Sequence, residues 1–252
     1  MIRRSPSSER GWPGSRPAAT PADAHATVFD MLEGKYMDDT LRGYFEKLTP
    51  FASLVFVGLG INRKFDDLPA LVSTLRLELP EPVRIADRET AAIGFHAFNH
   101  DPTLAPPGKT AAVSMFASSL EWWQNLAKDP SRYHAAKEAV ADKVVSLLER
   151  RFPGLAGQVE MRDVATPVTF VRYTGNWQGS IQGWTATPRT WMMRFRKTLP
   201  GLKNLWLCGQ WVEPIGGLPP SALSGRSVVQ IICHQDGREF TTSRPDSALS
   251  NK

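Results

Sequence analysis

A glycine-rich turn near the C-terminal end of the chain has the residue types best suited to holding a ligand. Gly209 ends a short apolar run, and the turn after it contains further glycines and prolines: Pro214, Gly216, Gly217, Pro219 and Pro220. Because proline is tolerated at the first positions of a helix, the pattern predicts that a helix begins here. A strand, a glycine turn and a helix N-terminus together favour an anion, since free amides and the positive helix end face it. Many α/β proteins use such a turn only for packing, and the residues fit either interpretation.

Small residues follow the prolines and would let a flat ligand approach the backbone closely. They are Ser221, Ala222, Ser224 and Gly225. Glu213 lies within the turn and is equally compatible with a functional role and with a solvated turn. Glu121, the other acid near a candidate turn, is better explained as a helix-capping residue.

Two histidines have the spacing of a helical metal pair. His96 and His100 are four residues apart, but the stretch around them is strand-like and lacks the glutamate of a His-Glu-x-x-His arrangement. We therefore predict no metal site. His25 follows Asp23 and Ala24 and is a candidate ligand contact, although a packed or capping histidine is the favoured alternative.

Aromatic residues are concentrated in the second half of the chain. Tyr173, Trp177 and Trp184 are candidates for the wall of a tunnel that takes a long apolar substrate. The alternative is that such rings, like those of Trp122 and Trp123, belong to the core. No catalytic triad is evident, and the catalytic residues are left unassigned.

A second glycine pair, Gly58 and Gly60, resembles the start of a dinucleotide-binding loop only superficially. The third glycine of Gly-x-Gly-x-x-Gly is missing, and Arg63 and Lys64 stand where a helix should open. We therefore reject this interpretation. The complete motif occurs nowhere in the sequence.

The elements that must position these residues follow from the hydrophobic pattern, which predicts an α+β or α/β chain. Helical spacing predicts helices over 37–48, 118–128, 131–151 and 221–233, the second of them starting from a Ser-x-x-Glu capping box at Ser118. Alternating or continuous apolar runs predict strands at 53–61, within 74–117, and at 159–164, 168–173 and 205–208. Residues 1–20 are predicted to be a disordered tail and residues 237–252 a polar tail. No internal repeat is evident.

Length and charge exclude several classes of protein. The 252 residues are 42% apolar and 22% charged, which suits a chain with a sizeable core. No apolar run approaches the roughly 18 residues needed to cross a bilayer. The net charge of +5 arises largely from arginines within residues 1–16, so nucleic acid is not an expected partner. Cys208 and Cys233 match no metal or redox spacing, which favours a reducing, cytoplasmic location.

Four stretches of the sequence carry a resemblance to a known family. They are residues 22–32, which begin Ala-Asp-Ala-His; the proline-rich turn at 101–108; residues 163–176, which contain Ala-Thr-Pro-Val-Thr-Phe-Val-Arg-Tyr-Thr-Gly-Asn; and residues 205–226, which contain the glycine turn. Together they resemble the C-terminal portion of the bacterial-type phytoene desaturase family of FAD-dependent oxidoreductases. This group includes carotenoid isomerases and retinol saturases.

The resemblance implies a role for each part of the chain. Residues 21–200 would be a substrate-binding domain with a mixed sheet and flanking helices, and residues 201–236 would be the last strand and helix of an FAD-binding domain. Gly209 and Gln210 would lie near the ribityl and pyrophosphate groups of FAD. The residues beside the flavin ring would be Pro214, Gly216, Gly217, Leu218 and Pro219, and the helix from Ser221 would direct its positive end to the ring.

The implied activity is FAD-dependent hydride transfer, of the desaturase or saturase type, on a hydrophobic substrate that is isoprenoid or carotenoid in kind. Peripheral contact with a membrane accompanies such a substrate. The N-terminal Rossmann half that binds the ADP part of FAD is not recognisable, so the chain is expected to be truncated, with that half as a missing partner. The alternative is a non-catalytic remnant, or one subunit of a split flavoprotein, that binds no FAD stably by itself. Ile215 and Pro220 stand where relatives often have glycine.

Overall fold

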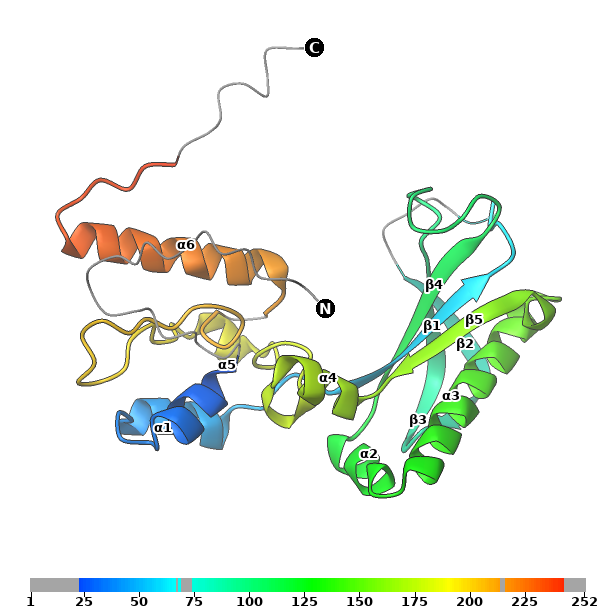
Figure 1. Cartoon of the computed structure of the whole chain (residues 1–252), viewed down its shortest axis with the longest axis horizontal. Helices are drawn as coiled ribbons and strands as arrows, with labels where there is room; N and C mark the ends of the chain where they lie inside the picture. The colour runs from blue at the N-terminus through cyan, green and yellow to red at the C-terminus, as the bar shows by residue number, and fades with distance from the viewer. Residues whose placement is uncertain (1–22, 67, 69–73, 214–215, 243–252) are drawn as a thin grey trace, which may run out of the picture.

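Five antiparallel strands and two helices form the lobe on the right of Figure 1, which we call the sheet lobe. The computed structural model describes residues 23–66, 68, 74–213 and 216–242. The strands are β1 (Leu54–Ile61), β2 (Leu75–Ile85), β3 (Arg88–Ala97), β4 (Thr110–Ala117) and β5 (Val159–Ala165), in the order β2-β3-β4-β1-β5. Every pairing is antiparallel, so the prediction of a mixed sheet is wrong. The connections from β2 to β3 and from β3 to β4 are hairpin-like, and such connections pair strands antiparallel.

Two helices of the sheet lobe begin at side-chain caps. α3 (Pro130–Arg151) starts at Asp129, whose carboxylate accepts from the amides of Ser131 and Arg132. α2 (Leu120–Ala127) starts at Ser119, which accepts from the Trp122 amide, so the predicted capping box at Ser118 is wrong. Ser118 is buried and instead donates to Asp87 and accepts from the Trp123 indole N–H, which makes its hydroxyl part of the core.

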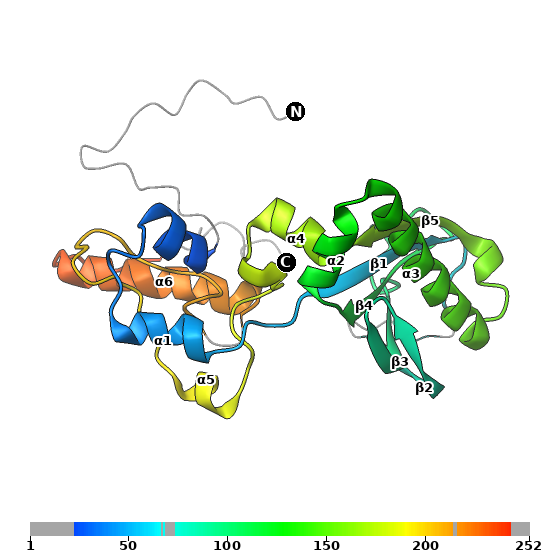
Figure 2. The same cartoon turned by 90° about the horizontal axis from the view of Figure 1, so that it is seen from below.

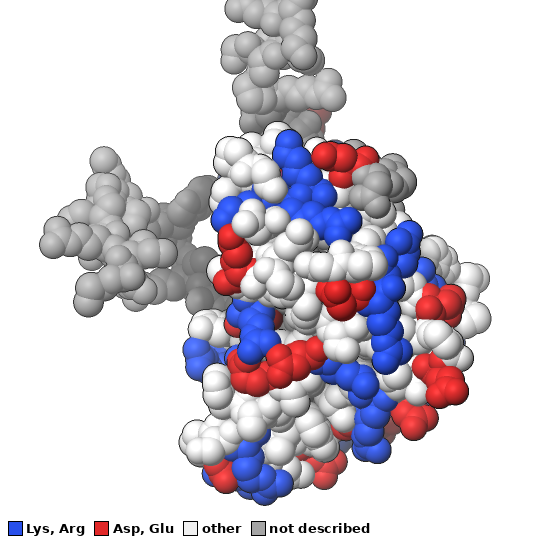
Figure 3. Space-filling view, turned by 90° about the vertical axis from the view of Figure 1, so that its right-hand side faces the viewer, with Lys and Arg blue, Asp and Glu red and all other residues white. Residues whose placement is uncertain are grey.

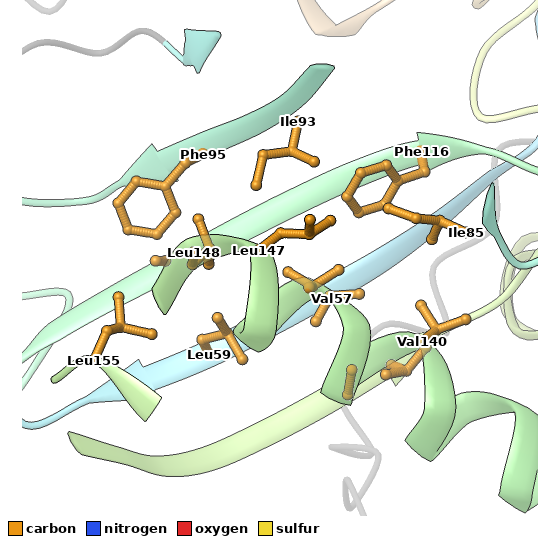
Figure 4. Packing of buried hydrophobic residues seen from close by; sticks show 14 of the residues in the cluster. Val57, Leu59, Ile85, Ile93, Phe95, Phe116, Val140, Leu147, Leu148 and Leu155 are labelled. Atoms are coloured by element: carbon orange, nitrogen blue, oxygen red, sulfur yellow. The ribbon is translucent and has the colours of Figure 1, made fainter. Parts of the chain in front are cut away.

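The core of the sheet lobe lies between the sheet and α3, as Figure 4 shows at close range. Every second residue of β1 is buried, so these apolar side chains lie on one face of the sheet. Apolar residues at helical spacing on α3 cover that face. The labelled side chains are Val57, Leu59, Ile85, Ile93, Phe95, Phe116, Val140, Leu147, Leu148 and Leu155. The long predicted helix and the strand at 53–61 are thus confirmed as α3 and β1.

The second lobe, which we call the helical lobe, is built from both ends of the described chain. Its elements are the π-helix η1 (Ala26–Met31), α1 (Asp39–Lys47), α5 (Pro188–Met192) and α6 (Leu218–Gln235). A separate hydrophobic cluster joins Leu41 and Tyr44 of α1 to Trp184, Phe195 and Trp211. The sheet lobe is therefore inserted between two segments that fold together, as Figures 1 and 2 show. The domain boundary at residue 200 stays a prediction.

Two predicted strands are absent from the described part of the chain. Residues 168–173 lie in α4 (Pro167–Thr174), because Thr166 and Thr169 cap each other's backbone amides and Pro167 favours the first helical position. Residues 205–208 form only one bridge, between Thr198 and Trp206, and so lack the neighbours that define a strand. The one-turn helices η2 (Ala156–Gln158) and η3 (Trp177–Gly179) complete the fold.

The surface of the sheet lobe carries charges of both signs. Lys and Arg alternate with Asp and Glu on the face shown in Figure 3, and Arg162, for example, pairs with Glu138 and Asp142 of α3. Within the described ranges, no helix has both the length and the hydropathy needed to cross a membrane.

Candidate functional site

Two glycines fix the predicted ligand-binding turn against a neighbouring loop. Gly183 lies so close to the turn that a Cβ there would overlap the carbonyl oxygen of Gln210. Gly216 has φ of +62°, and a Cβ at that position would lie 2.8 Å from the Cβ of Gln182. A side chain at either position is therefore incompatible with this packing. The turn is preformed by backbone contact with residues 182–183.

Polar contacts from α6 and from Lys197 hold the first half of the turn. The hydroxyl of Ser224, which is completely buried, accepts from the Gly209 amide at 3.3 Å and from Lys197 Nζ at 3.4 Å. Lys197 Nζ also donates to Glu213 Oε2 at 2.9 Å and to the Val212 carbonyl at 3.4 Å. Glu213 is thus the partner of a half-buried lysine rather than a solvated acid.

A side-chain hydrogen bond joins the two most specific sequence motifs. Gln210 Nε2 donates to Asn176 Oδ1 at 3.0 Å, and Asn176 is buried. Asn176 ends the motif at 163–176, whereas Gln210 lies in the turn 34 residues later. The two motifs that carry the family resemblance most specifically, at 163–176 and 205–226, are therefore also in contact in the folded chain.

The start of α6 offers fewer free amides than the sequence pattern predicts. Pro219 and Pro220 have no amide proton, and the Ser221 amide donates to the Gly217 carbonyl at 3.1 Å. Among residues 218–221, Leu218 is the only one with an amide N–H that donates to no acceptor within the described residues. The first four residues of α6 therefore contribute little to the predicted free amides, although the helix dipole remains.

The outer side of the turn is open. Leu218 is 87% exposed, Pro219 is exposed and Ser221 is half-buried. A Cβ built on Gly209, whose φ is +101°, would meet no atom within 4 Å. A ligand can therefore reach the backbone here. Pro214, which was also predicted to contact the ligand, lies outside the described residues.

A cluster of aromatic rings lies behind the turn and includes His25 of the first motif. The His25 ring stacks on Trp177 at 4.9 Å with an angle of 7°, and on Phe29 at 4.4 Å. The Trp177 ring lies 6.2 Å from that of Trp211, which belongs to the turn. His25 is therefore packed, as the favoured alternative predicts, and three of the four motifs converge on Trp177.

Next to this cluster, Asp23 is a buried carboxyl group. Burial raises its pKa above the usual value, while the backbone amide and the charge of His25 act in the opposite direction. Asp23 Oδ1 accepts from the His25 amide at 2.7 Å, which fixes the start of the π-helix. This carboxyl is a structural contact of the aromatic cluster.

The three predicted substrate residues have different surroundings. Trp184 is 1% exposed, its ring N–H donates to the Trp211 carbonyl at 3.1 Å, and it packs as a core residue. Trp177 is half-buried, with its ring 6.0 Å from that of Trp184. Tyr173 is 72% exposed, and the Arg172 guanidinium lies over its ring at 4.6 Å. The structure brings Trp177 and Trp184 together but leaves Tyr173 on the surface.

Two predicted features lie away from the turn. The proline-rich turn at 101–108 follows the Ala97 end of β3 and precedes the Thr110 end of β4, whereas α4 lies near the opposite end of that strand. His96 and His100 have ring centroids 6.3 Å apart. In the part of the chain that is described, no group of three or more His, Cys, Asp or Glu residues is placed to hold a metal ion.

Sequence reasoning missed Lys197, Ser224 and Asn176 as organisers of the site. Asn176 was visible in the motif at 163–176 but had no assigned partner. A short repeat was also missed. Ala-Thr-Pro-x-Thr followed by an aromatic residue occurs at 165–170 and again at 186–191, and each copy starts a helix with the same reciprocal threonine cap.

Comparison with known proteins supports the resemblance predicted from the motifs. A chloroplastic prolycopene isomerase from Daucus carota is 32% identical over 155 residues, which are 59% of this chain and 24% of that protein. The corresponding Arabidopsis thaliana protein is 32% identical over 128 residues, or 50% of this chain and 21% of its own length. Over half or more of its length, this chain is therefore similar in sequence to prolycopene isomerases.

This chain is also similar to two proteins that are described as oxidoreductases or as oxidoreductase-domain proteins. Pyridine nucleotide-disulfide oxidoreductase domain-containing protein 2 from Mus musculus is 31% identical over 140 residues, covering 52% of this chain and 23% of that protein. An oxidoreductase structure from Methanosarcina mazei has a TM-score of 0.44 and 19% identity, covering 82% of this chain and 41% of that one. No family model matches the sequence. The chain spans about a quarter of the length of the curated relatives it matches.

Proposed function

We propose that this chain is the C-terminal part of an FAD-dependent oxidoreductase that transfers hydride to or from a hydrophobic substrate, isoprenoid or carotenoid in kind. The observation that carries the proposal is the convergence of three family-like motifs on one turn, through the Gln210–Asn176 hydrogen bond and the stacking of His25 on Trp177. Homology to prolycopene isomerases supports it. We place the activity in the cytoplasm, at the periphery of a membrane.

The residues of the turn fit a flat anionic cofactor. The open space at Gly209 allows close approach to the backbone, and Gly209 and Gln210 would lie beside the ribityl and pyrophosphate groups. When bound, FAD would supply the hydride-accepting ring. The residues proposed to lie beside that ring are Pro214, Gly216, Gly217, Leu218, Pro219 and Ser221. The positive end of α6 stabilises negative charge at this place.

The substrate side of the proposed site is formed by aromatic residues. Trp177 and Tyr173 reach the surface and are proposed to contact the apolar substrate, which gains from burial against large rings. Trp184 would support Trp177 from the core. No catalytic residue is assigned among them, because FAD would supply the hydride-transferring ring when it is bound.

Exposed apolar side chains on α6 favour a second form of the same function, in which the chain is one subunit of a split flavoprotein. Leu218, Leu223, Val229 and Ile231 lie on this 18-residue helix and are each at least 36% exposed. Isolated exposed apolar residues are ordinary, but several on one helix mark an interaction surface. We propose that these exposed side chains of α6 contact an N-terminal FAD-binding half that completes the cofactor site.

A complementation experiment tests the proposal. The purified chain is mixed with FAD alone, and with FAD plus the N-terminal part of carrot prolycopene isomerase that lacks its own C-terminal quarter. We expect no stoichiometric flavin absorbance with the chain alone and a stable yellow complex with the added half. Stable FAD binding by the chain alone would disprove the need for a partner, and no binding in either mixture would identify a non-catalytic remnant.

Two variants make the complementation specific. Leu223→Glu with Val229→Glu changes only exposed positions of α6, so the fold should persist while the complex loses most of its flavin. Met161→Glu, at an exposed position on β5, is the matched control and should form the complex normally. Equal complementation by both proteins would show that the partner does not use α6.

A further inference from the structure

The short helix α5 carries two adjacent large side chains that are strongly exposed. Trp191 is 60% exposed and Met192 is 82% exposed. α5 lies at the lower edge of the helical lobe in Figure 2, beyond α1. Neither residue is part of the proposed cofactor site, so their exposure needs a separate explanation.

The segment around α5 is basic and contains no acid. Residues 186–205 include Arg189, Arg194, Arg196, Lys197 and Lys203, with no Asp or Glu among them. Arg196 pairs with Asp38 and Lys197 pairs with Glu213. Within the described ranges, the other three form no ion pair. Two of these, Arg189 and Arg194, are exposed and flank Trp191 and Met192.

The backbone of α5 is held rigidly before any partner arrives. Thr187 Oγ1 accepts from the Thr190 amide at 3.1 Å, and Thr190 Oγ1 accepts from the Thr187 amide at 2.7 Å. Thr190 Oγ1 also donates to the Thr185 carbonyl at 2.8 Å. Because these amides are paired internally, moving α5 out of water leaves few unpaired backbone groups.

We propose that α5 anchors the protein to an anionic lipid surface, with Trp191 and Met192 entering the headgroup region and Arg189 and Arg194 binding lipid phosphates. Tryptophan prefers the membrane interface because its ring is apolar and its N–H is polar. Basic side chains next to it are attracted to anionic headgroups. The charge of the segment commits it to an anionic surface rather than to an apolar protein groove. This inference rests on the membrane location given under the proposed function and names the segment and the lipid charge that produce it. Vesicle binding is measured without FAD, so its failure would leave the proposed redox chemistry untouched.

Vesicle flotation with the full chain tests the anchor. We use phosphatidylcholine vesicles with and without phosphatidylglycerol, at low and at high salt. The wild type should float with anionic vesicles and lose binding at high salt, since salt screens exposed charges. Arg189→Gln with Arg194→Gln should weaken binding by about fivefold for each charge removed. Trp191→Ser with Met192→Ser should weaken binding to the anionic vesicles by roughly tenfold or more.

The control variant is Met161→Ser, which removes an exposed apolar side chain from β5, in the other lobe. It should bind vesicles as the wild type does. Equal loss of binding by this control, or unchanged binding by the Trp191–Met192 double variant, would overturn the proposal. Absence of wild-type binding, together with a dimer that the double variant dissociates in sedimentation velocity, would reassign the surface to self-association.

Discussion

The two Ala-Thr-Pro-x-Thr segments have the same local chemistry but different surroundings. Thr166 and Thr169 start α4 in the same way as Thr187 and Thr190 start α5, with each threonine hydroxyl accepting from the other's amide. Thr166 is completely buried and its hydroxyl also bonds the Tyr133 hydroxyl of α3 at 2.6 Å. Thr187 is exposed. The Ala-Thr-Pro-x-Thr motif determines where each helix begins. The burial and contacts of its threonine cap determine how much that cap stabilises the protein.

The aromatic residue that follows each cap shows the same difference. Phe170 packs on Phe56 of β1, with ring centroids 5.3 Å apart, so α4 is tied to the sheet. Trp191, at the equivalent position of α5, is exposed. One copy therefore packs its aromatic ring against the sheet, whereas the other exposes its aromatic ring at the surface.

The largest expected effect in this comparison comes from Thr166→Val. The substitution keeps the shape but leaves the Thr169 amide and the Tyr133 hydroxyl without their buried partner. We expect a loss of about 2–3 kcal/mol in the free energy of unfolding. Urea unfolding followed by circular dichroism measures it, and Thr166→Ser, which keeps the hydroxyl, should recover most of the loss. A loss below that of the exposed cap would contradict the comparison.

Thr187→Val is the matched change in the exposed copy. Water replaces the lost hydroxyl at an exposed N-cap, so we expect only about 1 kcal/mol. The same urea experiment applies, with Thr187→Ser as the control. Equal destabilisation by the two valine variants would show that burial and the Tyr133 contact add nothing to the α4 cap.

A double-mutant cycle isolates the Tyr133 contact. Tyr133→Phe and Thr166→Val should show a coupling of about 0.5–1.5 kcal/mol, the usual contribution of one hydrogen bond between neutral groups. The free energies of unfolding of the two single variants and the double variant provide the measurement. Additive effects would mean that the hydrogen bond between the Tyr133 and Thr166 hydroxyls does not stabilise the protein.

Long periodic elements were predictable from the sequence, whereas the two short capped helices were not. α3, β1 and α6 follow from apolar spacing sustained over eight or more residues. Residues 168–173 alternate in a strand-like way, and their helical start depends on a threonine pair at a position where a glutamate or glutamine is the usual signal.

The candidate site was predictable as a turn but not as a set of contacts. The glycines, the prolines and the start of α6 are all local features. The bonds of Lys197 to Glu213, Ser224 to Gly209 and Gln210 to Asn176 join residues 15 to 34 positions apart. No local pattern contains that information, because such contacts exist only once the lobe has folded. The repeated Ala-Thr-Pro-x-Thr segment is visible in the sequence, whereas the different surroundings of its two copies are not.

The smallest expected effect links the exposed cap to the proposed lipid anchor. Thr187→Val loosens the start of α5 but keeps Trp191, Met192 and both flanking arginines. A less ordered α5 loses more conformational freedom when it binds a membrane. The affinity for anionic vesicles should therefore fall by about twofold to threefold, which corresponds to well under 1 kcal/mol. Thr166→Val, measured under conditions where it is folded, should leave vesicle binding unchanged. Similar losses in both variants would mean that vesicle binding follows overall stability rather than the order of α5.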